Sequence, residues 1–267
     1  MPAFLCATCG VQYPDSAAPP ARCVICEDPR QYVGAGGQRW TTHEALLASH
    51  FNVLRDIGHG MIGIGVMPAF AIAQRAILLR TPVGNVLWDG LSLLDPATVE
   101  AIRALGGLAA IAISHPHYYG NMVDWGRAFR CPVLIHEADR EWAVRPDSCL
   151  QFWSGETHAV LPDVTLHRLG GHFAGGAVLH WDAGDGVLLT GDIASVAPDR
   201  QHVSFMWSFP NWVPLPAAEV ARMGAILGQL EFDAVYGAWW DRVIARDGRA
   251  AVARSVARYV RAVTEGL

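Results

Sequence analysis

Hydrophobic and polar positions alternate regularly from about residue 40 to the C-terminus, with two distinct periods. Short apolar runs bounded by Gly, Pro, Asn or Asp predict strands, whereas apolar residues spaced three and four positions apart predict helices. Strands are expected at residues 62–66, 70–80, 86–89, 108–113, 132–135, 164–169 and 234–236, with a hairpin over 177–190 that turns at 182–186. Helices are expected at residues 41–48, 95–105, 121–129, 217–230 and 248–263. Groups of strands separated by helices indicate a layered α/β architecture.

The first 38 residues lack this pattern and contain four of the six cysteines, in two CxxC pairs separated by thirteen residues: Cys6, Cys9, Cys23 and Cys26. Each CxxC places two thiolates on one tight turn, and two such turns facing each other form the tetrahedral sulfur cage that Zn²⁺ prefers. We expect a zinc ribbon whose metal supplies its folding free energy. Four thiolates also hold a single iron ion. The remaining Cys131 and Cys149 are expected as buried thiols.

The composition narrows the classes of function. The chain has 267 residues, of which 52% are hydrophobic and 17% charged, and its formal net charge is -5. These values exclude a disordered chain and a basic nucleic-acid surface. None of the 20 basic residues is lysine, which excludes a P-loop lysine and a Schiff-base lysine. A globular enzyme with a small-molecule substrate, and with no nucleic-acid or membrane partner, is expected.

The expected cellular compartment follows from two features that the sequence does not show, a secretory signal and a membrane span. No apolar run reaches the roughly 18 residues of a membrane span. The N-terminal MPAFLCATCG has neither a basic nor an extended apolar region, so it does not resemble a secretory signal. We expect a cytoplasmic protein, in which paired cysteines bind metal rather than form disulfides. The sequence indicates no oligomeric state.

Three of the eleven histidines stand at positions suited to metal binding. His115 and His117 directly follow an apolar strand; if extended geometry continues, their imidazoles point to the same side. His172 follows Gly170 and Gly171 after the next strand group, and Asp192 ends the run LLTGD. Loops that follow strands are where functional groups gather in layered α/β folds. These four side chains are candidate metal ligands.

The segments SHPHYYG, GGHFAGG and LLTGDI resemble those of the metallo-β-lactamase fold superfamily, over about residues 57 to 245. The resemblance implies an α/β fold, an αββα sandwich of the metallo-β-lactamase type, here with a small N-terminal four-cysteine metal ribbon similar to a zinc ribbon or rubredoxin knuckle. The domain boundaries expected are 1–38 for the ribbon and 39–267 for the metallo-β-lactamase-like domain. Asp89 resembles the superfamily's early structural aspartate.

The chain departs from this resemblance at the second metal site. The superfamily motif is HxHxDH, and Tyr119 and Gly120 stand where its Asp and last His would be. The late histidine is also missing, because no histidine follows His202; Asp241 is the only nearby replacement. A phenol is a poor substitute for a carboxylate, and glycine offers no ligand atom. We therefore expect an empty second site and a single ion on the four candidate ligands, either Zn²⁺ or Fe²⁺.

The leading hypothesis is a metallohydrolase whose mononuclear zinc activates a water that attacks an ester, thioester, lactone or amide. The phenol of Tyr118 or Tyr119 would replace the second metal as a donor to the oxyanion, with Asp192 as a catalytic ligand. Alternatively, the tyrosines pack against Trp239 and Trp240 and fill the lost site.

Two other functions stay open. The first is a mononuclear non-haem iron oxidoreductase similar to persulfide dioxygenases, and the second is a catalytically degenerate binding protein. The aromatic segment 202–216 is interpreted as an apolar lid over a pocket, with ordinary core packing as the alternative.

Overall fold

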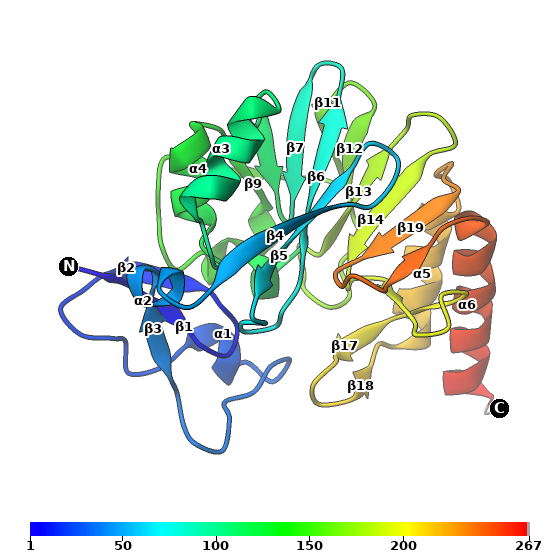
Figure 1. Cartoon of the computed structure of the whole chain (residues 1–267). Coiled ribbons are helices and arrows are strands. Elements are labelled where there is room, and N and C mark those ends of the chain that lie inside the picture. The colour runs from blue at the N-terminus through cyan, green and yellow to red at the C-terminus, as the bar shows by residue number, and fades with distance from the viewer. Residues whose placement is uncertain (266–267) are drawn as a thin grey trace. The chain divides into compact units, whose positions relative to one another are not determined.

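The computed structural model describes residues 1–265, and the chain divides into two compact units, Met1–Trp153 and Ser154–Leu267 (Figure 1). The first unit contains a three-stranded and a seven-stranded sheet. The second contains a six-stranded sheet and two short two-stranded sheets. Both units combine sheets with helices, as the alternation in the sequence predicted. The boundary between a ribbon of residues 1–38 and a domain of residues 39–267 stays a prediction.

The three-stranded sheet of the first unit forms the ribbon. Its antiparallel strands lie in the order β2-β1-β3, with β1 at Ala3–Cys6, β2 at Gln12–Asp15 and β3 at Trp40–Thr42. The one-turn helix α1 (Val24–Glu27) follows, in sequence, Cys23 of the second CxxC. Tyr13 joins these parts, because its hydroxyl accepts a hydrogen bond from Val24 N (2.9 Å) and its ring meets the Trp40 ring edge-on at 5.0 Å.

The seven-stranded sheet comprises β4 (Phe51–Asp56), β5 (Ile62–Met67), β6 (Ala76–Thr81), β7 (Gly84–Trp88), β8 (Ala110–Ala112), β9 (Val133–His136) and β10 (Leu150–Trp153). Its strand order is β10-β9-β8-β7-β6-β5-β4. Strands β4 to β7 pair antiparallel, and β7 to β10 pair parallel. The parallel strands require crossover connections. Their carboxyl ends therefore share one sheet edge, from which the His115 loop departs.

The crossovers between these parallel strands contain the helices α3 (Pro96–Ala104) and α4 (Met122–Phe129) and the 3-10 turns η1 (Pro116–Tyr118) and η2 (Glu137–Trp142). Helix α2 (His43–Leu47) lies earlier, between β3 and β4. The Asp95 carboxylate caps α3 by accepting a hydrogen bond from Thr98 N (2.8 Å), and Pro96 occupies the first helical position. Arg103 of α3 donates to Ala128 O of α4 (3.0 Å), so the two helices lie next to each other (Figure 1). The helix predictions are confirmed here.

The second unit is built on a six-stranded sheet whose strands are β11 (Thr157–Leu161), β12 (Val164–Arg168), β13 (Ala177–Trp181), β14 (Val187–Gly191), β19 (Ala234–Gly237) and β20 (Val243–Ile244). Its strand order is β11-β12-β13-β14-β19-β20. The predicted hairpin is confirmed as β13 and β14, whose connection contains Gly184 and Gly186 in left-handed conformations. Strand β19 pairs parallel to β14, so Asp192 follows a central strand of this sheet.

The strand predictions failed mainly at the sheet edges. The edge strands β4, β10, β11 and β20 were not predicted, and their side chains are mostly exposed or half-buried. An edge strand without a buried face shows no clear apolar alternation in sequence. Residues 70–75, expected to begin a strand, are irregular instead, because Ala71 and Ala73 adopt left-handed conformations (φ 53° and 60°) and β6 begins only at Ala76.

Two helices and two small sheets complete the second unit. Helices α5 (Ala217–Leu227) and α6 (Gly248–Thr264) pack against each other. The small sheets pair β15 (Ser195–Val196) with β16 (Val203–Ser204), and β17 (Met206–Ser208) with β18 (Val213–Pro214). A buried apolar cluster that includes Val178, Leu188 and Val220 joins the sheet to the helices. Within residues 1–265, no helix is both long and apolar enough to cross a membrane.

Two histidines of this sheet, His167 and His180, lie outside the candidate ligand set. The His180 Nε2 donates to Glu231 O (2.7 Å), since a carbonyl only accepts. The His167 ring lies 6.0 Å from the His180 ring, and burial lowers the pKa of His167 to about 4. The His180 side chain therefore joins β13 to the segment that contains Glu231, and the His167 ring on β12 lies beside it.

Candidate metal centres

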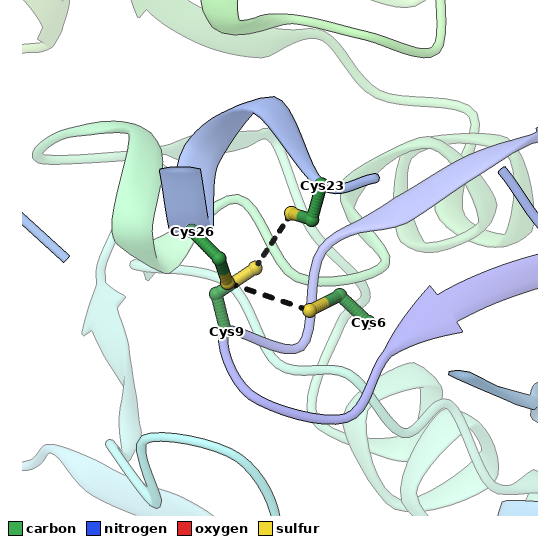
Figure 2. A group of neighbouring side chains, drawn as sticks. All are labelled: Cys6, Cys9, Cys23 and Cys26. Carbon is green, nitrogen blue, oxygen red and sulfur yellow. Dashed lines mark hydrogen bonds between the residues drawn. The ribbon is translucent and has the colours of Figure 1, made fainter. Parts of the chain in front are cut away.

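The four cysteines of the ribbon meet in one group (Figure 2). The Sγ atoms of Cys6 and Cys26 lie 3.5 Å apart and those of Cys9 and Cys23 lie 3.6 Å apart, and all four sulfurs lie within 4.8 Å of one another. A tetrahedral zinc with Zn–S bonds of about 2.3 Å holds its sulfurs roughly 3.8 Å apart. The cage therefore fits a tetrahedral ion, as the CxxC spacing predicted.

Hydrogen bonds around the cage favour the thiolate form of Cys6. Cys6 Sγ accepts hydrogen bonds from Thr8 N (3.4 Å) and Gln38 Nε2 (3.1 Å). Hydrogen bonds from neighbouring thiols hold the pKa of Cys6 below that of an ordinary thiol, whereas burial raises the pKa of Cys9 well above it. Four buried thiols at this spacing cannot all ionise alone, so a cation is needed to hold four thiolates together.

His115 and His117 also lie together, but by a different local structure from the one expected. The extended continuation after the strand is wrong: Pro116 begins the 3-10 turn η1. Proline suits the first position of a helical turn because its φ is fixed near the helical value. The two rings nevertheless lie 5.2 Å apart, and one ring nitrogen of each lies within 4.8 Å of the other. The turn therefore keeps the pair close enough for a shared ion.

A hydrogen-bonded relay orients the His115 ring. Asp89, at the end of β7, accepts hydrogen bonds on Oδ1 from the Ser114 backbone N (2.8 Å) and from Ser114 Oγ (2.7 Å). Because the serine proton goes to the aspartate, Ser114 Oγ accepts the Nδ1 proton of His115 at 2.9 Å. The ligand lone pair of His115 is then on Nε2. The resemblance pointed to Asp89; Ser114 was missed, although it precedes the histidine directly.

Removing the serine hydroxyl tests this relay. We expect Ser114→Ala to weaken Zn²⁺ binding at the histidine pair by about 10- to 100-fold, because the ring loses the acceptor that fixes its tautomer. Chelator competition measures the affinity. Ser255→Ala, at another buried serine in α6, is the matched control and should leave Zn²⁺ affinity unchanged. Equal affinities in both variants would show that the relay does not orient a ligand.

His172 is oriented within the second unit. It follows Gly170 and Gly171, both left-handed at φ 68° and 78°. A Cβ at Gly171 would lie 2.9 Å from the Leu215 side chain, so this turn needs glycine. The buried ring donates its Nδ1 proton to the carbonyl of Trp207 (2.8 Å), which leaves the Nε2 lone pair for a ligand bond. The Trp207 carbonyl gave no sequence signal, since any residue has one.

Asp192 lies immediately after β14 and is buried. Gly191 before it is left-handed (φ 55°), and the Ala238 N donates to Gly191 O (3.0 Å), which fixes the turn against the end of β19. A buried carboxylate needs a compensating positive partner or hydrogen bonds. The position and burial of Asp192 therefore suit a metal ligand.

The positions of the superfamily's second site carry no fitting ligands in the first unit. A Cβ at Gly120 would lie 2.7 Å from the Leu91 carbonyl group, so no side chain fits there without backbone movement. Tyr119 is fully buried and its hydroxyl donates to Asp139 O (3.2 Å); burial raises the pKa of Tyr119 well above its usual range. The Tyr118 ring lies 4.4 Å from that of His115. The catalytic roles of Tyr118 and Tyr119 stay predictions.

The segment around Asp241 in the second unit offers no well-placed ligand in place of the missing late histidine. The Asp241 side chain is 70% exposed and pairs with Arg242 (3.2 Å). Its use as a replacement ligand has no support in this arrangement. The packing of Trp239 and Trp240 against the tyrosines also stays a prediction.

Ordinary core packing accounts for part of the aromatic segment 202–216, and its role as a lid over a pocket stays a prediction. Phe205 is fully buried in the apolar cluster of the second unit, as ordinary core packing requires. The rest forms the hairpin β17–β18, which supplies the Trp207 carbonyl and places the Phe209 ring 5.8 Å from that of His172. Trp212 at its tip is 84% exposed. The hairpin therefore belongs to the surroundings of His172.

Comparison with known proteins gives one close relative. No family model matches the sequence. The chain is 46% identical over 272 residues to the uncharacterized protein YmaE of Bacillus subtilis (strain 168), covering 100% of this chain and 99% of that protein. The chain belongs to the YmaE family. The match therefore spans this chain from end to end, its cysteine ribbon included.

Solved structures show which fold this chain has. A B3 metallo-β-lactamase with an active-site glutamic acid matches with a TM-score of 0.54 and 19% identity, covering 78% of this chain and 87% of that one. The DIM-1 metallo-β-lactamase matches with a TM-score of 0.58 and 9% identity, covering 80% and 96%. A metallo-β-lactamase variant from Cronobacter sakazakii matches at 0.52 and 18%, covering 80% and 93%. The fold expected from the sequence, α/β of the metallo-β-lactamase type with an N-terminal four-cysteine group, is confirmed.

Proposed function

We propose that this protein is a mononuclear metal-dependent hydrolase whose catalytic ion is held by His115, His117, His172 and Asp192. Three imidazoles and one carboxylate form a donor set that suits Zn²⁺ and that also accommodates Fe²⁺. The ribbon cysteines would hold a second, structural zinc ion.

The observation that carries this proposal is the fixed tautomer of two histidines. Ser114 Oγ takes the Nδ1 proton of His115, and the Trp207 carbonyl takes that of His172. Histidines that ligate metals almost always donate their other ring N–H in this way. A histidine that only fills a core does not need its neighbours to fix its tautomer, whereas here both rings are fixed with the proton on Nδ1.

A single catalytic ion, rather than a pair, agrees with the local structure. Gly120 has no room for a side chain, and the hydroxyl of Tyr119 is engaged by Asp139 O. Asp241 is exposed and paired with Arg242. The residues that would complete a second site in the superfamily are thus replaced by groups that cannot ligate.

The proposed substrate is a small molecule with an ester, thioester, lactone or amide bond. A bound zinc ion would lower the pKa of a water molecule to about 7 and so supply a nucleophile at neutral pH. Tyr118, whose ring lies against His115, is the phenol proposed first to donate a hydrogen bond to the developing oxyanion. Tyr119 could take this role only by releasing Asp139 O, to which its hydroxyl donates. The exposed Trp212 of the β17–β18 hairpin suits an apolar part of the substrate.

Metal analysis combined with a hydrolysis screen tests the proposal. The full chain, purified without added metal, is expected to contain zinc in both sites and to hydrolyse at least one of a set of nitrophenyl esters, thioesters and lactones. Removal of zinc with a chelator should abolish turnover, and added Zn²⁺ should restore it. A chain that binds no metal at its histidines would contradict the proposal. Iron at the histidines with oxygen uptake in the presence of a persulfide would replace it by the oxidoreductase alternative.

A further inference from the structure

Three backbone segments of the first unit meet next to the His117 turn. They are residues 10–12, which follow the first cysteine knuckle, residues 90–92, which follow β7, and residues 118–121, which follow His117. Gln12 N donates to Gly120 O (3.0 Å), and Ser92 Oγ donates to Gly10 O (3.0 Å). The ribbon is therefore bonded directly to the loop that carries the histidine pair.

The middle segment ties the other two together. Gly90 N donates to Tyr118 O and Asn121 N donates to Leu91 O, both at 2.9 Å. The segments lie too close for side chains: a Cβ at Gly90 would lie 2.3 Å from Tyr118 O, and one at Gly10 would lie 2.2 Å from Ser92 Oγ. Backbones packed this closely transmit a displacement instead of absorbing it.

The side chain of Gln12 is also fixed on the far side of the loop. Its Nε2 donates to Asp124 Oδ2 of α4 (3.0 Å), and its Oε1 accepts from Arg145. Arg145 is buried and also donates to Asp124 Oδ1 (2.8 Å). Gln12 thus bonds to the loop through its backbone and to the helix that follows the loop through its side chain.

On its N-terminal side, Gln12 directly follows the knuckle that carries Cys6 and Cys9. Gly10 N donates to Cys6 O (2.8 Å) and Cys6 N donates to Val11 O (3.0 Å), which closes the knuckle between Cys6 and Cys9. A metal ion on these sulfurs would fix the knuckle, because it would bind Cys6 and Cys9 at the same time. The position of residues 10–12 then follows from the geometry of the cage.

We propose that the ribbon positions the histidine pair, and that Gln12 is the positioning residue that connects them. The proposal rests on the proposed function, in that His115 and His117 are taken as ligands. The metal-fixed knuckle holds Gln12, Gln12 holds Gly120, and Gly120 closely follows the turn η1 that carries His117. Loss of the ribbon metal is then expected to weaken metal binding at the histidines.

Cobalt titration of full-length variants tests this connection. Co²⁺ bound to thiolates absorbs strongly through charge transfer, whereas Co²⁺ bound to imidazole and carboxylate absorbs weakly, so one titration reports both sites. Gln12→Pro removes the N–H that Gly120 O accepts. We expect it to lower Co²⁺ affinity at the histidines by at least about tenfold, the size of an outer-shell effect. The imidazole NMR signals of His115 and His117 in the metal-free chain should shift as well.

A matched control separates this bond from the general stability of the ribbon. Ser16→Pro removes another backbone bond of the ribbon, from Ser16 N to Pro2 O (3.1 Å), away from the loop. It should leave the histidine-site affinity unchanged. Gln12→Ala keeps the N–H and loses only the side-chain bonds, so a smaller decrease in the same direction is expected.

The outcomes distinguish the two proposals. If the wild-type chain shows no cobalt at its histidines, the proposed function fails. If it binds cobalt there and Gln12→Pro binds it equally well, the positioning role is overturned and the proposed function stands. If Gln12→Pro also loses the thiolate absorption, the histidine-site affinity still decides: a decrease supports the coupling, and an unchanged affinity overturns it.

Discussion

Replacing His172 with alanine is expected to abolish hydrolysis and to remove the metal ion from the histidine site, while the ribbon keeps its own ion. Alanine offers no ligand atom, and the remaining ligands leave the ion with one bond fewer. Changes to outer-shell partners typically cost 10- to 100-fold in metal affinity. The loss of a ligand itself should exceed about 100-fold. Elemental analysis and the hydrolysis screen measure the two effects on the same sample.

His158→Ala is the matched control for this variant. His158 lies on β11 of the same unit and is not one of the candidate ligands. It should retain both metal ions and full activity. His172→Ala with undiminished hydrolysis would refute the proposed site, because His172 would then not touch the reacting centre. If His172→Ala kept its metal ion and lost its activity, His172 would contact the substrate and not the metal.

Replacing Cys9 with serine is expected to empty the ribbon and unfold it. The serine hydroxyl stays protonated at neutral pH and cannot take the place of a thiolate. Structural zinc contributes about 10–16 kcal/mol in small zinc-binding peptides, so the loss of the ion removes a large part of what stabilises the ribbon. The loss of the cobalt–thiolate absorption and of the NMR signals of β1 to β3 measures the effect.

Cys131→Ser provides the control for Cys9→Ser. Cys131 is a buried thiol outside the cage, and burial raises the pKa of Cys131 to about 11, so it stays protonated at neutral pH. Its replacement should cost some packing energy but no ribbon metal. If Cys9→Ser retained the thiolate absorption, the assignment of a four-cysteine metal site would be wrong. If the positioning role of Gln12 is correct, Cys9→Ser should also weaken metal binding at the histidines.

Much of the fold could be predicted because its signals are local. The N-cap Asp95 with Pro96 specified the start of α3, and the Thr42 cap specified α2. The four edge strands β4, β10, β11 and β20 could not be predicted, because their side chains lack a continuous buried face. Apolar alternation arises from burial, and an edge strand has little of it.

The sequence by itself determined the two groups of candidate ligands. CxxC spacing puts two sulfurs on one turn, and HPH puts two imidazoles close together whether the backbone is extended or, as here, turned. Both relations hold within three or four neighbouring residues, so they can be recognised in the sequence before the fold is known.

Only the tertiary structure decided how those ligands are oriented and held. Asp89 reaches Ser114 across 25 positions, Trp207 reaches His172 across 35, and Gln12 reaches Asp124 across 112. Two of the groups involved in the proposed assembly belong to the backbone: the Trp207 carbonyl, which every residue has, and the Gln12 N–H, which every residue except proline has. The type of residue at a position does not indicate such contacts, because they form only when distant segments fold against each other.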